Sequence, residues 1–164
     1  MRIYTLGTAN RTKEEFLKIL DKYRIKAIFD VRRFPNSHFE HFKRENLIKI
    51  CEENKITYTY LGNELGGFRK GGYLKWTETQ TFKKGIEIIY KTASYLPAVI
   101  ICREKYPFYC HRKYIADDLS KKDVEVIHII SEEKTISHKE LNYERTGKRN
   151  KRIKEKKERN NFSS

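Results

Sequence analysis

Short apolar segments alternate along the chain with longer segments in which apolar residues recur every three or four positions. The short segments have the length and composition of buried strands, and the longer ones the periodicity of one helix face. Strands are predicted at residues 2–6, 27–31, 56–61, 98–101 and 124–130. Helices are predicted at residues 12–24, 43–54 and 79–94, and after Pro107 to about residue 121. This order predicts an α/β fold: a single open, mostly parallel five-stranded sheet with helices on both faces.

Local signals support this assignment. Residues 27–31 (A-I-F-D-V) are nearly all apolar, which indicates a strand buried on both faces, as in a parallel sheet. Thr12, with Glu15 three positions later, predicts a capping box at a helix start. Residues 62–76 hold five of the eight glycines and are too long for an ordinary connection, so we expect a functional loop there.

Charge divides the chain into two parts. We expect one α/β domain at residues 1–137 and a basic tail at residues 138–164 that is exposed or disordered until it meets a partner. The chain carries 36 Lys and Arg against 22 Asp and Glu, a net charge of +14. The tail accounts for +6 of this, which leaves +8 for the domain. Such a charge favours a polyanionic partner, nucleic acid first, although solubility alone would also explain it.

Composition bears on the environment of the protein. The chain has 35% charged residues, a single methionine and a single glutamine, which is typical of a thermophile, although codon bias in an AT-rich genome gives a similar composition. Three widely spread cysteines do not form a disulfide framework. No apolar run approaches the length of a membrane span and no signal peptide is recognisable, so we expect a soluble, cytoplasmic protein without a membrane partner.

Polar residues follow the predicted strands, and the carboxyl ends of parallel strands meet at one edge of a sheet. We therefore expect a site built from Asn10 and Arg11 after the first strand, Asp30, Arg32, Arg33 and Ser37 after the second, Glu64 after the third, and Cys102, Glu104, Cys110, His111 and Arg112 after the fourth. Tyr73, Trp76 and Tyr106 lie in the flanking loops and suit the stacking of a planar base, although loop anchoring would also explain them.

Asp30 is the favoured catalytic candidate. A carboxylate inside an apolar strand is costly unless it is paired, and Arg32 or Arg112 could pair with it. The pair could simply fix the loop, but a general base is the preferred interpretation. The same reasoning applies to Glu104.

Cys110 and His111 could act as nucleophile and base, although cysteine is also a common buried apolar residue. A cysteine phosphatase loop is excluded, because Phe108 and Ala116 stand where C-x5-R requires arginine. Cys102, Cys110 and His111 lack the usual spacing of zinc ligands, so no metal is expected. Glycine motifs for nucleotide cofactors are missing as well, and no cofactor is expected.

Four ordered blocks carry a family resemblance: G-T-A-N-R at 7–11, D-V-R-R-F-P-N-S at 30–37, L-G-N-E-L-G-G at 61–67 and C-R-E-K-Y-P-F-Y-C-H-R at 102–112. Together they resemble the domain-of-unknown-function 488 family over roughly residues 2–130. Members often have Gly-His-Ser-Asn where this chain has Gly-Thr-Ala-Asn, so no role is implied for side chains 8 and 9. The resemblance implies an α/β fold with a shared polar pocket, and no established reaction.

The leading functional hypothesis from the sequence is a metal-independent hydrolase of glycosidic bonds in nucleic acid, DNA being the expected partner, in base processing or repair. Asp30 would act on water or on the developing positive charge, and Glu104 or His111 would assist proton transfer. The first alternative is a thiol or sulfur-handling enzyme that uses Cys110 or Cys102 on a small anion. The second alternative is a nucleic-acid-binding module without catalysis.

Overall fold

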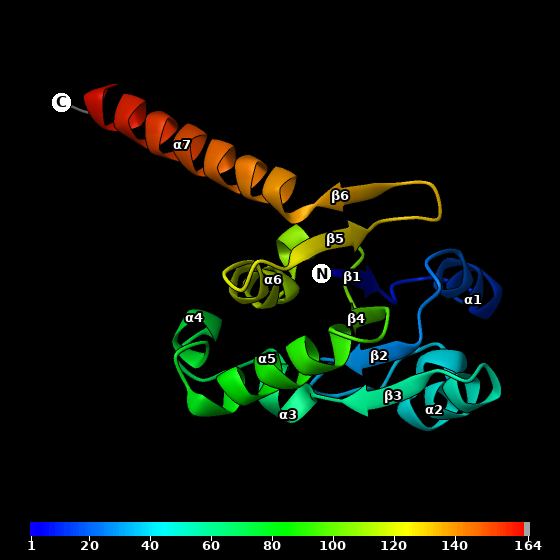
Figure 1. Ribbon diagram of the computed structural model, residues 1–164. Coiled ribbons are helices and arrows are strands. Elements are labelled where there is room, and N and C mark those ends of the chain that lie inside the picture. Colours follow the sequence, from blue (N-terminus) through cyan, green and yellow to red (C-terminus); the bar gives the residue numbers. More distant parts are fainter. Residues whose placement is uncertain (163–164) are drawn as a thin grey trace.

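The computed structural model describes residues 1–162, which form one α/β domain with a long C-terminal helix (Figure 1). Within these residues the sheet has six strands, in the order β3-β2-β4-β1-β5-β6. The strands are β1 (Arg2–Gly7), β2 (Ala27–Asp30), β3 (Thr57–Tyr60), β4 (Ala98–Cys102), β5 (Glu125–Ile129) and β6 (Thr135–Ser137). The first five strands pair in parallel, and β6 pairs antiparallel with β5. The predicted open, mostly parallel sheet is confirmed, with one strand more than expected.

Helices cover both faces of the sheet, as predicted. They are α1 (Lys13–Lys22), α2 (Arg44–Glu53), α3 (Gly62–Leu65), α4 (Tyr73–Trp76), α5 (Gln80–Ala93), α6 (Arg112–Ser120) and α7 (His138–Phe162), with 3-10 turns η1 (Glu40–Phe42) and η2 (Pro107–Tyr109). The apolar sides of α1 and α2 pack with Phe16 and Leu47 on one face. Those of α5 and α6 pack with Phe82 and Ile115 on the other.

Strand β4 lies at the centre of the sheet and is buried along its whole length. Its side chains alternate between the two cores: Val99 and Ile101 contact the α1–α2 side, while Ile100 and Cys102 contact the α5–α6 side. A strand buried on both faces needs a continuous apolar sequence, which is the pattern of this segment. The alternation places the Cys102 thiol at the carboxyl end of β4, on the side covered by α5 and α6.

Two segments without a predicted strand or helix contain regular structure. Strand β6 follows a tight turn in which the Lys134 N–H donates to the Ser131 carbonyl. It was missed because Ile136 is its only apolar residue. The glycine-rich segment 62–76 contains the short helices α3 and α4, and its aromatic residues anchor it: the Tyr73 hydroxyl donates to the Leu65 carbonyl over 2.7 Å.

The start of α1 confirms half of the predicted capping box. The Thr12 hydroxyl accepts a hydrogen bond of 3.0 Å from the Glu15 N–H. The Glu15 carboxylate turns instead to Arg11, with which it forms an ion pair of 3.0 Å. The cap therefore satisfies one free N–H group of the helix and also helps to hold the loop after β1.

The basic segment after residue 137 differs from the predicted tail. Its described residues form the helix α7, which extends away from the sheet in Figure 1. His138 and Leu141 are buried against the domain, so the start of this segment belongs to the fold. Residues 146–161 are exposed, as expected. Among the described residues, no helix has both the length and the apolar character needed to cross a membrane.

Candidate functional site

Three reactive side chains meet where β4 ends. Cys102 is the last residue of β4, and the chain returns through η2 to bring Cys110 and His111 beside it at the start of α6. The two sulfur atoms and the imidazole nitrogen offered by His111 all lie within 4.8 Å of one another. His111 Nδ1 is 3.8 Å from Cys110 Sγ and 4.0 Å from Cys102 Sγ. Both thiols are buried and the imidazole is half-buried, so this is a sheltered site with one partly accessible group.

The orientation of His111 is fixed by the backbone after β2. Its Nε2 lies 3.1 Å from the Val31 carbonyl oxygen, which can only accept a hydrogen bond. Nε2 therefore carries a proton, and Nδ1 is left to accept one from Cys110. Cys102 Sγ lies at a similar distance from both nitrogens, 3.8 Å from Nε2 and 4.0 Å from Nδ1. The Tyr73 ring lies 5.1 Å from the imidazole. A Cβ atom at Gly67 would lie 3.1 Å from Nδ1, so glycine leaves room for the imidazole. The glycine-rich loop thus forms one wall of the site.

Arg112 lies fully buried next to the thiols. Its Nη1 donates to the Thr5 hydroxyl over 3.2 Å, and its Nη2 donates to the backbone carbonyl of Glu104. Its Nε is buried without a hydrogen-bond partner in the described part of the chain. In the same part of the chain, no carboxylate forms an ion pair with Arg112. A buried positive charge is costly unless an anion compensates it, so the site favours a negative charge close by.

The pKa values of the two thiols shift in opposite directions, although the Arg112 charge lowers both. A hydrogen bond from Cys102 lowers the pKa of the Cys110 thiol well below its ordinary value, and the Arg112 charge and His111 act the same way against burial. The hydrogen bond to Cys110 and burial together raise the pKa of the Cys102 thiol. Cys51 is packed in the other core, where burial raises its pKa to about 12. Of the three cysteines, Cys110 is therefore the one whose surroundings favour the thiolate.

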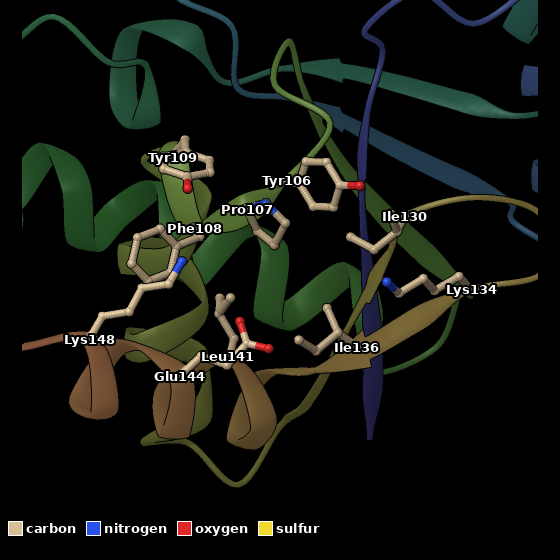
Figure 2. A pocket seen from close by; sticks show the side chains of 10 residues that line it. All are labelled: Tyr106, Pro107, Phe108, Tyr109, Ile130, Lys134, Ile136, Leu141, Glu144 and Lys148. Atoms are coloured by element: carbon tan, nitrogen blue, oxygen red, sulfur yellow. The ribbon is translucent and has the colours of Figure 1, made fainter. Parts of the chain in front are cut away.

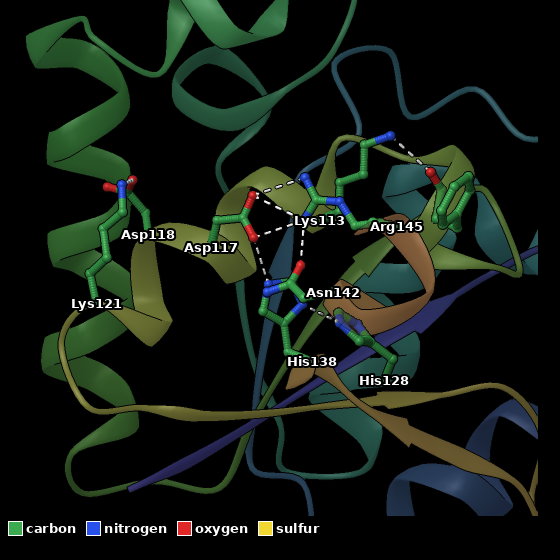
Figure 3. A network of polar contacts seen from close by, with 9 residues as sticks. Lys113, Asp117, Asp118, Lys121, His128, His138, Asn142 and Arg145 are labelled. Carbon is green, nitrogen blue, oxygen red and sulfur yellow. Dashed lines mark hydrogen bonds and ion pairs between the residues drawn. The ribbon is translucent and has the colours of Figure 1, made fainter. Parts of the chain in front are cut away.

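A buried polar network continues from Arg112 towards α7. It links Thr5, His128, His138, Asp117 and Arg145 through contacts of 2.6, 3.0, 2.7 and 2.9 Å in that order. Figure 3 shows its part from His128 to Arg145. Burial lowers the pKa of His128 to about 2, with the charge of Arg112 acting in the same direction. Sequence reasoning did not find this network, although a histidine inside the apolar strand V-E-V-I-H-I-I was a signal for it.

Asp30 has a different environment from the one expected of a general base. It is fully buried, and its two carboxylate oxygens each accept a hydrogen bond of 2.8 Å from the Arg32 guanidinium. The Tyr58 hydroxyl donates a further bond of 2.5 Å to the same carboxylate. Arg32 also donates to the Phe42 carbonyl over 2.7 Å. This geometry favours the alternative interpretation from the sequence, an ion pair that fixes the loop after β2.

Several other candidates also hold loops in place. Arg11 is buried and donates to the carbonyls of Gly7 and Ile130, each over 2.7 Å. Arg33 donates to the Phe68 carbonyl, and the Ser37 hydroxyl accepts from the Phe39 N–H over 3.1 Å. Arg11 thus ties the loop after β1 to the end of β5, and Arg33 ties the loop after β2 to the loop after β3.

The remaining candidates lie around the thiols rather than among them. Asn10 and Glu104 have exposed side chains. Glu64 has one buried carboxylate oxygen without a hydrogen-bond partner in the described residues, and its carbonyl accepts a bond of 2.8 Å from Trp76 Nε1. Tyr106 is 48% exposed and directly precedes η2. The structure thus brings together Cys102, Cys110, His111 and Arg112 as the compact reactive group.

The residue types in this group could also hold a metal ion. Two cysteines and one histidine are zinc ligands, and catalytic zinc sites use three protein ligands. Spacing along the sequence argued against a metal, but the fold supplies Cys102 from a strand and the other two residues from a helix start. Spacing along the chain therefore does not decide whether this group binds a metal ion, and the expectation of no metal stays a prediction.

Fold and site together define an open, mostly parallel α/β protein with a dithiol–imidazole cluster at the carboxyl ends of its central strands. A family model described as "Domain of unknown function DUF488" matches residues 12–119, from the start of α1 to the last turn of α6, and the chain belongs to this family. The match includes the whole cluster and excludes α7. Neither the curated proteins nor the solved structures include a match to this chain.

Proposed function

We propose that the protein is a thiol-dependent enzyme in which Cys110 is the nucleophile and Cys102 the second, resolving thiol. The observation that carries the proposal is the buried guanidinium of Arg112, which has no carboxylate partner in the described residues and lies beside the thiol whose pKa is lowered. A thiolate on Cys110 would compensate that charge. The start of α6 at Arg112 adds the partial positive charge of a helix N-terminus.

Two neighbouring thiols favour a sulfur electrophile such as a disulfide. The Cys110 thiol would give its proton to His111 Nδ1, and the resulting thiolate would attack one sulfur of the substrate. The S–S bond would break, and the leaving thiolate would take that proton back from Nδ1. His111 would then accept the proton of Cys102, whose sulfur attacks Cys110 and releases the second half of the substrate as a thiolate. The substrate gains two electrons, and the two cysteines lose two in forming their disulfide.

Reaction with a small organic disulfide tests this proposal. Mass spectrometry of the wild-type protein should detect an internal disulfide between Cys102 and Cys110. Cys102→Ser should stop at a mixed disulfide on Cys110, because the resolving thiol is missing. Cys110→Ser should not react at this site. Cys51→Ser is the matched control and should behave as wild type, because its thiol lies in the other core.

The result that would refute the proposal is equal or faster modification of Cys51 or Cys102 than of Cys110. The metal content of the purified protein is a necessary companion measurement. One tightly bound zinc per chain, lost in both Cys102→Ser and Cys110→Ser, would make the cysteines ligands instead of nucleophiles.

Hydrolysis of a glycosidic bond has less support in this geometry. Its proposed base, Asp30, is fully buried and accepts bonds from Arg32 and Tyr58, whereas a general base must reach a substrate or its water. Replacing Asp30 is therefore expected to act on stability first, as developed below.

A further inference from the structure

The exposed part of α7 carries a basic stripe. Five exposed basic side chains lie along one side of the helix, because they are one, three or four residues apart and so fall within one sector of the helical turn: Lys148, Arg149, Arg152, Lys156 and Arg159. The four acidic residues of α7 share a different side: Glu140, Glu144, Glu155 and Glu158. The helix is 25 residues long, or about 37 Å at 1.5 Å per residue. Its charges are therefore sorted and not merely abundant.

The stripe begins beside an aromatic turn. Lys148 Nζ lies 4.2 Å from the centre of the Phe108 ring and 5.8 Å from that of Tyr109, both in η2. Tyr109 is 71% exposed, so most of its ring is open to a ligand. Figure 2 shows Lys148 directed from α7 towards these rings.

A pocket of about 290 Å³ lies between η2, the turn after β5 and α7 (Figure 2). Its walls combine the rings of Tyr106 and Phe108 with the cations of Lys134 and Lys148 and one carboxylate, that of Glu144. Planar rings next to lysine side chains are the combination that binds a base and its phosphate.

We propose that the basic stripe of α7 and the aromatic turn η2 bind single-stranded nucleic acid. The stripe contacts successive phosphates, and an unpaired base stacks on Tyr109 or enters the pocket beside Tyr106. This inference goes beyond the thiol chemistry and does not depend on it. Because Cys110 directly follows η2, a strand bound there lies next to the thiol site.

Two other partners fit these features less well. An anionic membrane would need an apolar helix face, but among the side chains of residues 146–161 Ile153 is the only large apolar one. Duplex nucleic acid would match the stripe, but its bases are stacked on each other and would leave the exposed rings of η2 unused. An unpaired strand uses both the cations and the rings.

The test is fluorescence anisotropy with a labelled oligothymidylate, measured on the full chain over a range of salt concentrations. The stripe variant is Lys148→Gln/Arg152→Gln/Lys156→Gln. The matched control is Lys151→Gln/Lys154→Gln/Lys157→Gln, which removes the same charge from other sides of the same helix. A strand releases about 0.7 counterions per phosphate contact, so the stripe variant should reduce the salt slope by about 2. The control variant should leave the slope close to that of wild type.

A second variant tests the stacking. Tyr109→Ala should weaken binding by about 5- to 150-fold at an unchanged salt slope, because one stacked base is lost and no cation is removed. The same sequence as a duplex should bind more weakly than the single strand. Cys110→Ser should bind as wild type, which separates this proposal from the proposed thiol reaction.

Three results would overturn the inference. An equal reduction of the salt slope in the stripe variant and in the control variant would mean that only the net charge of the helix matters. Equal affinity for duplex and single strand, with no effect of Tyr109→Ala, would mean a general polyanion surface. Binding to vesicles that contain phosphatidylserine, without binding to the oligonucleotide, would mean a membrane-surface helix.

Discussion

Lowering the pH from about 7 to about 5 is expected to destabilise the folded protein through His128. This imidazole is fully buried, and both ring nitrogens are engaged: Nδ1 with the Thr5 hydroxyl at 2.6 Å and Nε2 with His138 at 3.0 Å. Burial, aided by the charge of Arg112, lowers the pKa of His128 in the folded state from 6.5 to about 2. The folded protein therefore holds this imidazole neutral at either pH.

The magnitude follows from the difference between the two states. In the unfolded chain His128 takes up a proton near pH 6.5, so between 6.5 and about 2 the unfolded state binds the additional proton. The contribution of the neutral His128 to the free energy of unfolding is fully present above pH 6.5. It falls by about 1.4 kcal/mol for each pH unit below that value. At pH 5 the loss is about 2 kcal/mol, a large part of the stability of a single domain.

Urea unfolding at both pH values, with wild type and His128→Asn, measures this effect. The asparagine can still exchange hydrogen bonds with its neighbours but cannot titrate. The loss of stability between the two pH values should be smaller in the variant by about 2 kcal/mol. The Cys110 thiolate contributes pH dependence of the same sign, but it is present in both proteins and cancels in the comparison. Equal pH dependence in the two proteins would refute the reasoning.

Two further predictions concern stability. Asp30→Ala should lower the free energy of unfolding by about 3–5 kcal/mol, because it leaves the buried Arg32 charge unpaired. Glu125→Ala breaks the exposed pair with Arg2 and should cost less than about 1 kcal/mol, and equal losses in urea titrations would contradict this account. Gly7→Ala should lower the free energy of unfolding by about 1–3 kcal/mol, because the new Cβ would lie 2.0 Å from the Glu104 carbonyl oxygen and displace that loop. An unchanged midpoint of urea unfolding would count against this contact.

The fold was largely predictable because apolar periodicity is strong where an element is buried. Residues 98–101 predicted the central strand, since burial on both faces requires a continuous apolar run. The same signal fails where elements are exposed. Strand β6 has a single apolar residue, Ile136, and α7 beyond its first turns has no apolar face, so its helicity rests on local preference and on the docking of Leu141.

The candidate site was predictable in position more than in chemistry. Cys102, Cys110, His111 and Arg112 were all selected because they follow the central strand, and the structure brings them together. Their roles depend on distances that spacing along the chain does not encode. The sequence-based hypothesis gave Asp30 the catalytic role. Its bidentate pairing with Arg32, which favours a structural role, is seen only in the structure.

The most direct test of the account is the pH dependence of the alkylation of Cys110 by a small reagent, read by mass spectrometry at each of the three cysteines. The account predicts that Cys110 reacts as a thiolate at neutral pH, well below the pH at which a free thiol does. It also predicts that Arg112→Met shifts the pH profile of Cys110 alkylation to higher pH. Cys51 should remain unreactive over the same range, because burial holds its pKa near 12. A Cys110 profile that rises only at the pKa of an ordinary thiol, and that Arg112→Met does not move, would contradict the central claim.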